Sequence, residues 1–149
     1  MVINTKRFGE IIAEEQEIIQ FPAGLLAFEN LVRFALLDIS NNPVFKWLQS
    51  IEAPEIAFLL VDPFVFKQDY YLDLDPELTW ELEIQKPEDV LVYTTVTIPK
   101  HDFKQATTNL VGPLVINQTS KRGKQVILDK EDLAIKYPLF SDYRLSGGY

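Results

Sequence analysis

Seven short apolar runs, separated by turn-forming residues, limit what this chain can fold into. Each is apolar throughout or alternates apolar with polar residues, which is typical of β-strands. Runs 56–61 and 90–98 are apolar or β-branched at nearly every position, so we predict central strands there. Pro63 and Pro99 follow these two runs and end them, since proline has no N–H for a ladder. We therefore predict an all-β, mainly antiparallel sheet. The runs are 18–21, 33–37, 45–51, 56–61, 90–98, 114–117 and 124–128.

Helix signals are few, and we predict one or two short helices. The best starts at Asp75, which can cap, continues through Pro76 at the first helical position, and places Leu78 and Leu82 on one face. Lys86-Pro87 is expected to end it. A second short helix is predicted from about residue 30, and a capped turn at 129–133.

Turn and core residues complete the local prediction. Between two strand-like runs, residues 120–123 are predicted to form a hairpin in which Gly123 supplies a positive φ. The large aromatic residues at strand spacing are predicted to be core rather than binding residues. They are Phe21, Phe28, Phe34, Phe45, Trp47, Phe58, Phe64 and Phe66.

Length and composition indicate one domain. A chain of 149 residues can bury a sufficient core without disulfides, so we predict a single domain over 1–140. Residues 141–149, which include Gly147-Gly148, are predicted to form a loose tail. The absence of Cys excludes thiol catalysis and thiolate metal sites. Met1 to Arg7 contain no signal region, and no apolar run reaches the roughly 18 residues of a membrane span. We expect a cytoplasmic protein, monomeric on its own, with no membrane contact.

Charge is concentrated in one segment. The net charge is −8, and residues 62–90 carry nine acids and two bases, or −7. Such an excess argues against nucleic acid as a direct partner and favours a basic protein, whose association it would accelerate. A solvated face that only keeps the protein soluble is an equal alternative. Tyr70 and Tyr71, between Asp69 and Asp73, suit the centre of a protein interface, although one tyrosine packing in the core is an equal alternative.

Catalytic patterns are scarce. His101 is the only histidine, no serine lies in a Gly-x-Ser-x-Gly elbow, and no glycine-rich phosphate loop is present. The remaining chemical alternative is carboxylate-based, with Asp69, Asp73, Asp75 and Glu77 as a metal or acid/base site. Their spacing does not fit an EF-hand loop, so no metal, cofactor or catalytic residue is predicted. A self-assembling β-protein is a third alternative.

Several sequence pieces, in order along most of the chain, resemble one known family. The resemblance is to the flagellar assembly factor FliW family, from residue 2 to about 139. This sequence has Leu26-Ala27 where the family pattern reads Pro-Gly, so the geometry of the turn at these two residues is left open. The pieces include IIQFP at 18–22, GL at 24–25, FKWLQS at 45–50, AF at 57–58, VDP at 61–63, DY at 69–70, NLVGPLVIN at 109–117 and QVIL at 125–128.

The resemblance implies a compact, antiparallel, barrel-like fold, no enzyme activity and two protein partners. These are flagellin and CsrA, an RNA-binding carbon storage regulator whose repression of flagellin translation the family relieves after flagellin is secreted. Direct competition with RNA and an effect at a distance both stay open. The predicted partner-binding residues are Asp69, Tyr70, Asp73, Asp75, Glu77, Asn109 and Pro113, with a structural turn as the alternative at 109–113.

Overall fold

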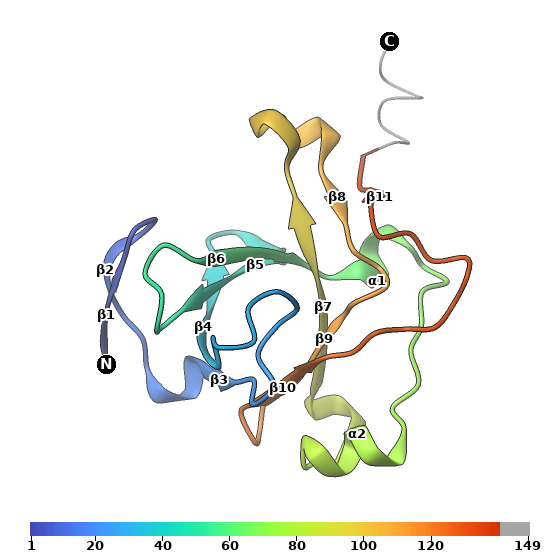
Figure 1. The fold of residues 1–149 in the computed structure, drawn as a ribbon, viewed down its shortest axis with the longest axis horizontal. Coiled ribbons are helices and arrows are strands. Elements are labelled where there is room, and N and C mark those ends of the chain that lie inside the picture. The colour runs from blue at the N-terminus through green and yellow to red at the C-terminus, as the bar shows by residue number, and fades with distance from the viewer. Residues whose placement is uncertain (141–149) are drawn as a thin grey trace.

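Seven strands close into a barrel in the computed structural model, which describes residues 1–140 (Figure 1). Their order around the barrel is β7-β6-β5-β4-β3-β10-β9, and β9 pairs again with β7. All neighbours are antiparallel except β3 and β10, which are parallel. The predicted all-β, barrel-like fold is confirmed. The strands are β3 (Ile18–Gln20), β4 (Arg33–Ile39), β5 (Asn42–Ser50), β6 (Ala57–Val61), β7 (Val90–Thr97), β9 (Leu114–Asn117) and β10 (Arg122–Gln125).

The remaining elements decorate this barrel. β1 (Val2–Thr5) and β2 (Gly9–Ile12) form a separate hairpin, at the opposite side of Figure 1 from α1 (Pro63–Phe66). β8 (Thr107–Thr108) pairs with the end of β7, and β11 (Tyr137–Pro138) pairs with β8. α2 (Pro76–Glu81) packs Leu78 and Leu82 against Val115 of β9. No helix among residues 1–140 is long and apolar enough to cross a membrane. The short 3-10 helices are Glu15–Glu17, Pro87–Asp89, Pro99–His101 and Phe103–Gln105.

The barrel interior holds the main core. Alternate residues of each strand point inward, where Phe21 meets Phe34 edge to face at 5.6 Å and both are fully buried. Leu60 of β6 is also fully buried, and β6 has partners on both sides, so the prediction of a central strand is confirmed. The aromatic prediction is wrong for Phe64, which is 39% exposed because it projects from the first turn of α1 beyond the end of β6.

The β9–β10 hairpin is present, but Gly123 does not supply its positive φ. Lys121 does, at φ 61°. Gly123 lies inside β10 with a negative φ, and a Cβ there would be 2.6 Å from the ring of Phe21. The glycine therefore permits close packing rather than a turn. β10 also begins two residues before the predicted run, at Arg122.

The predicted helix at Asp75 is confirmed, whereas the one near residue 30 is wrong. Asp75 Oδ1 accepts the N–H of Leu78 at 2.8 Å, and the helix ends at Glu81 because Glu83 turns left-handed at φ 56°. It thus ends before Lys86-Pro87. Residues 30–32 form only a turn and its exit, with the N–H of Leu31 donating to Phe28 O at 3.1 Å.

The turn at Leu26-Ala27 yields a stability prediction. Ala27 has φ 69°, a conformation that costs residues with a Cβ roughly 1–2 kcal/mol. Glycine avoids this cost but is more flexible when unfolded, which offsets about 0.4–1 kcal/mol. We expect Ala27→Gly to raise the free energy of unfolding by about 0.5–1 kcal/mol, measured by urea denaturation. Ala57→Gly in β6 is the matched control and should destabilise; a loss for Ala27→Gly would contradict the turn.

Candidate functional site

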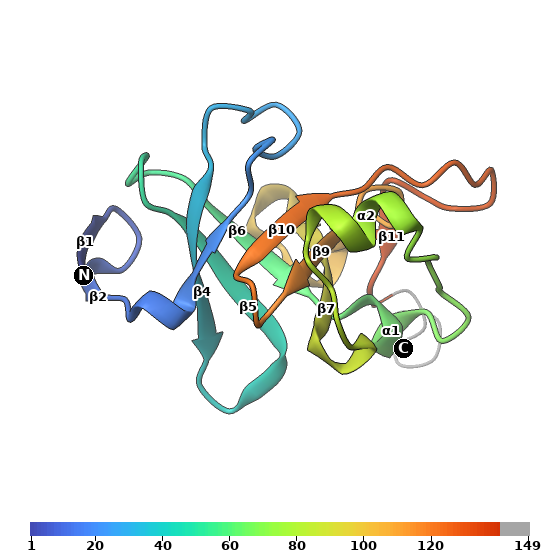
Figure 2. The same ribbon diagram turned by 90° about the horizontal axis from the view of Figure 1, so that it is seen from below.

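The acidic segment, defined as residues 62–90, runs along the outside of the barrel from the end of β6 to the start of β7 (Figures 1 and 2). It contains α1, α2 and the 3-10 helix Pro87–Asp89. Two buried attachments fix it. Tyr70 is 3% exposed and its hydroxyl donates to Leu110 O at 2.7 Å, while Leu78 and Leu82 hold α2. Burial raises the pKa of Tyr70, so the phenol stays protonated as a donor. These two attachments hold the backbone of the acidic segment, and hence its charged side chains, in place on the barrel.

Three of the acids are paired with bases. Asp69 meets Lys67 at 2.9 Å, Glu81 meets Lys124 at 2.8 Å, and Glu83 meets Arg122 at 3.0 Å. The hydrogen bond from Lys67 lowers the pKa of Asp69, which keeps that exposed carboxylate ionised. The last two pairs tie α2 and the residues after it to β10.

Two further acids are used by the backbone. Asp62 Oδ1 accepts the N–H of Phe64 at 3.0 Å, and Asp75 caps α2. By contrast, Asp73, Glu77 and Glu88 are exposed and form no ion pair within residues 1–140. These three carboxylates are therefore the charges most available to a partner.

The carboxylates at 69–77 do not converge. Asp69 turns to Lys67 and Asp75 to its own helix, and in the described part of the chain no three acidic or histidine side chains gather as metal ligands. His101 is exposed in a 3-10 turn. The geometry offers no support for a carboxylate-based metal or catalytic site.

The loop 109–113 lies beside the acidic segment and is a structural turn. Asn109 Oδ1 accepts the N–H groups of Val111 at 2.9 Å and Gly112 at 3.2 Å, and Pro113 is buried. The hydrogen bond from the Tyr70 hydroxyl to Leu110 O joins this loop to the acidic segment. Tyr70 and Pro113, however, are buried, so they pack beneath this surface and are not exposed on it. Tyr71 is 60% exposed, with Lys130 Nζ 3.3 Å from its ring centroid.

Trp80 is the surface residue that the sequence interpretation missed. Its side chain is 80% exposed on α2, next to a hollow of about 200 Å³ that Pro22, Ala23 and Lys124 also line. A signal was available, because Trp80 lies two residues after Leu78 and hence about 200° around the helix from the buried face. A large aromatic ring among carboxylates is a favourable centre for a protein contact.

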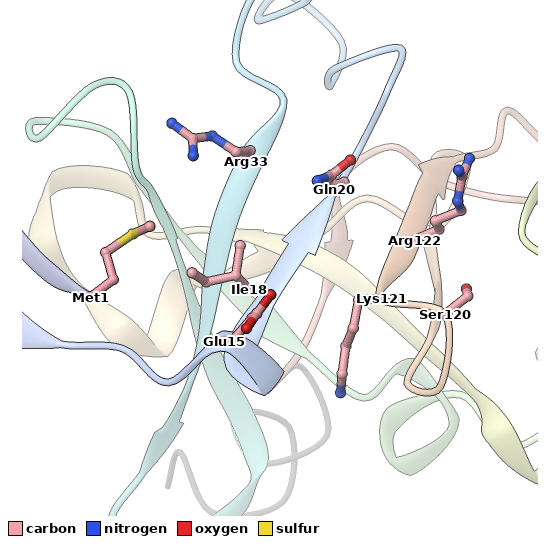
Figure 3. Close-up of a pocket in the computed structure, with 8 residues that line it drawn as sticks. All are labelled: Met1, Glu15, Ile18, Gln20, Arg33, Ser120, Lys121 and Arg122. Atoms are coloured by element: carbon pink, nitrogen blue, oxygen red, sulfur yellow. The ribbon is translucent and has the colours of Figure 1, made fainter.

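A further hollow lies across β3 and the turn before β10, and has a volume of about 620 Å³ (Figure 3). Strand register places Arg33, Gln20 and Arg122 in a row across it. Each arginine is already engaged through Nε, with Glu52 at 2.9 Å and Glu83 at 3.0 Å. Glu15 is the one acid among the residues that line the hollow, so it holds no pair of carboxylates for acid/base catalysis.

The fold and this surface define a small closed β-barrel whose candidate site is an exposed, acidic protein-binding face. Comparisons identify the family. The family model described as FliW protein matches residues 2–139. The flagellar assembly factor FliW of Moorella thermoacetica is 45% identical over 142 residues, covering 95% of this chain and 90% of that protein. That of Clostridium tetani is 42% identical, covering 95% and 97%.

A solved structure agrees with the sequence relatives. The crystal structure of the flagellar assembly factor FliW superposes with a TM-score of 0.84 at 35% identity, covering 95% of this chain and 99% of that one. The chain belongs to the FliW family. Its role is in flagellar assembly, and its relatives are named as assembly factors rather than enzymes.

Proposed function

We propose that this protein is a non-enzymatic, cytoplasmic factor that binds flagellin and the translational regulator CsrA. Binding of CsrA relieves its repression of flagellin translation, and occupation by flagellin prevents that binding until flagellin is secreted. Membership of a family of flagellar assembly factors supports a function in binding other proteins, and flagellin and CsrA are the partners that the sequence resemblance implies. The observation that carries the proposal is the acidic segment itself, in which Asp73, Glu77 and Glu88 stay exposed without an ion pair within residues 1–140 and Trp80 of α2 is 80% exposed.

The chemistry of CsrA fits the acidic segment. A protein that binds RNA presents lysine and arginine to phosphates, so its surface is basic. Opposite charge on the two proteins accelerates their encounter, and salt weakens the effect because the Debye length is only about 8 Å at physiological ionic strength. Asp73, Glu77 and Glu88 are expected to contribute most to the attraction of CsrA, because no lysine or arginine of the same chain has to be displaced from them.

Charge reversal tests this electrostatic contribution. We expect Asp73→Lys with Glu77→Lys to lower the association rate constant for CsrA about tenfold or more at low salt, and less at physiological salt, in stopped-flow measurements. Asp75 is left unchanged because it caps α2. The control pair, Glu10→Lys with Glu55→Lys, makes the same change of net charge, from −8 to −4, outside the acidic segment. Equal rates for both pairs at low salt would contradict a localised site.

Competition tests the switch. One interface takes about 800 Å² per partner, about 10% of a small protein's surface, so area alone allows both partners to bind. Exclusion therefore requires overlapping sites or a coupling free energy between them. α2 offers overlap because Trp80 belongs to the acidic segment and also lines the hollow beside β10. We expect flagellin to weaken CsrA binding about 5- to 150-fold in a titration with labelled CsrA. A ternary complex at full CsrA affinity, seen by native mass spectrometry, is the contrary result.

A further inference from the structure

One edge of β10 and of the residues after it lacks a complete strand partner. The N–H of Val126 donates to Pro113 O at 2.9 Å and that of Leu128 donates to Val111 O at 2.8 Å. In an antiparallel ladder, successive residues direct their backbone groups to opposite edges. The N–H and C=O groups of Gln125 and Ile127 therefore point away from β9.

On that far edge the barrel closes over a very short distance. β3 pairs with β10 only at Gln20 and Arg122, after which the chain turns away at Pro22. Outside the strand ladders, no hydrogen bond within residues 1–140 engages the amide of Gln125 or of Ile127. The loop after β3 reaches the side chain of Gln125, where the N–H of Leu26 donates to Gln125 Oε1 at 2.8 Å. An open strand edge of this kind is a template for an added strand.

Two hollows lie along the same edge. The first, of about 200 Å³, lies between Trp80 of α2 and Pro22, and the second, of about 120 Å³, lies between the turn at Leu26 and Ile127. Figure 2 shows β10 between α2 and the loop that follows β3. Trp80, Leu26 and Ile127 are 80%, 56% and 56% exposed. Backbone bonds and alternate apolar pockets are the two requirements of strand addition.

Charge distinguishes this edge from the acidic face. Arg122 and Lys124, the cations of β10, are paired with Glu83 and Glu81, which leaves the exposed Glu29 beside the second hollow as the charge at this edge without an ion pair within residues 1–140. The edge fits a neutral, apolar segment, whereas the exposed carboxylates of the acidic segment fit a basic protein. Of the two proposed partners, a flagellin subunit outside the filament is the one whose assembly surfaces are still uncovered.

We infer that an extended segment of flagellin adds as a strand to the edge formed by Gln125 and Ile127. Its backbone pairs with their amide and carbonyl groups, and its small apolar side chains enter the two hollows. This inference rests on the proposed binding of flagellin.

Amide exchange measured by NMR, with and without monomeric flagellin of the same bacterium, tests the inference. In the free protein, the amides of Gln125 and Ile127 should exchange at least tenfold faster than those of Val126 and Leu128. Flagellin should slow them at least tenfold. Flagellin binding without this protection overturns the inference and leaves the proposed function standing, whereas no flagellin binding at all overturns both.

A matched pair of proline variants gives a second test. Ile127→Pro removes an amide donor that the fold does not use, so the melting temperature should hold while flagellin affinity falls tenfold or more. Val126→Pro removes the bond to Pro113 O and should lower the melting temperature instead. Full flagellin affinity of a folded Ile127→Pro variant overturns the inference.

Discussion

Replacing Trp80 with alanine is expected to weaken CsrA binding by about 30- to 1,000-fold, because truncation of a central aromatic residue typically costs about 2–4 kcal/mol of binding free energy. Trp80 is 80% exposed in the free protein, and the exposed Glu77 lies three residues before it in α2. A partner that covers this ring removes a large apolar surface from water. Isothermal titration calorimetry measures the loss directly.

Stability measurements separate this effect from misfolding. Because Trp80 has few contacts to lose, Trp80→Ala should change the free energy of unfolding by less than about 0.5 kcal/mol. Ile12→Ala is the control for loss of exposed apolar surface, since Ile12 is 73% exposed on β2, outside the acidic segment. Unchanged CsrA affinity in Trp80→Ala, or an equal loss in Ile12→Ala, would contradict a contact centred on α2.

Phe21→Ala is expected to cost about 3–5 kcal/mol of unfolding free energy, or roughly 10²- to 10⁴-fold in the unfolding equilibrium. Phe21 is fully buried, packs against Phe34 and lies directly under Gly123. It follows β3 at the point where only one residue pair joins β3 to β10. The cavity would thus open beside the shortest seam of the barrel.

Urea denaturation followed by tryptophan fluorescence and circular dichroism checks this value. Phe64→Ala provides the comparison at an aromatic site that is 39% exposed, and should cost less than about 1.5 kcal/mol. If the two variants lose similar stability, Phe21 does not have the central packing role that its burial indicates.

The sequence determined most of the local structure, because local rules govern it. Apolar runs located the seven strands of the barrel, although not the short strands β1, β2, β8 and β11. Asp75 with Pro76 located α2, since capping and the fixed φ of proline act within one turn. The family pieces, spread from residue 2 to about 139, correspond to the match over residues 2–139. The acidic excess of 62–90 was also evident from residue counts alone.

Long-range packing decided which of those residues form a surface. Tyr70 became a buried anchor because Leu110 O lies 2.7 Å from its hydroxyl, and Gly123 met Phe21 rather than forming a turn. Glu81 forms an ion pair with Lys124 of β10, 43 residues away along the chain, whereas Asp73 forms no ion pair in the described part of the chain. Such pairings depend on where the barrel closes. Residue spacing carries no record of that closure, so the availability of each carboxylate followed only from the tertiary structure, whereas the position of Trp80 two residues after Leu78 already placed its ring away from the buried face of the helix.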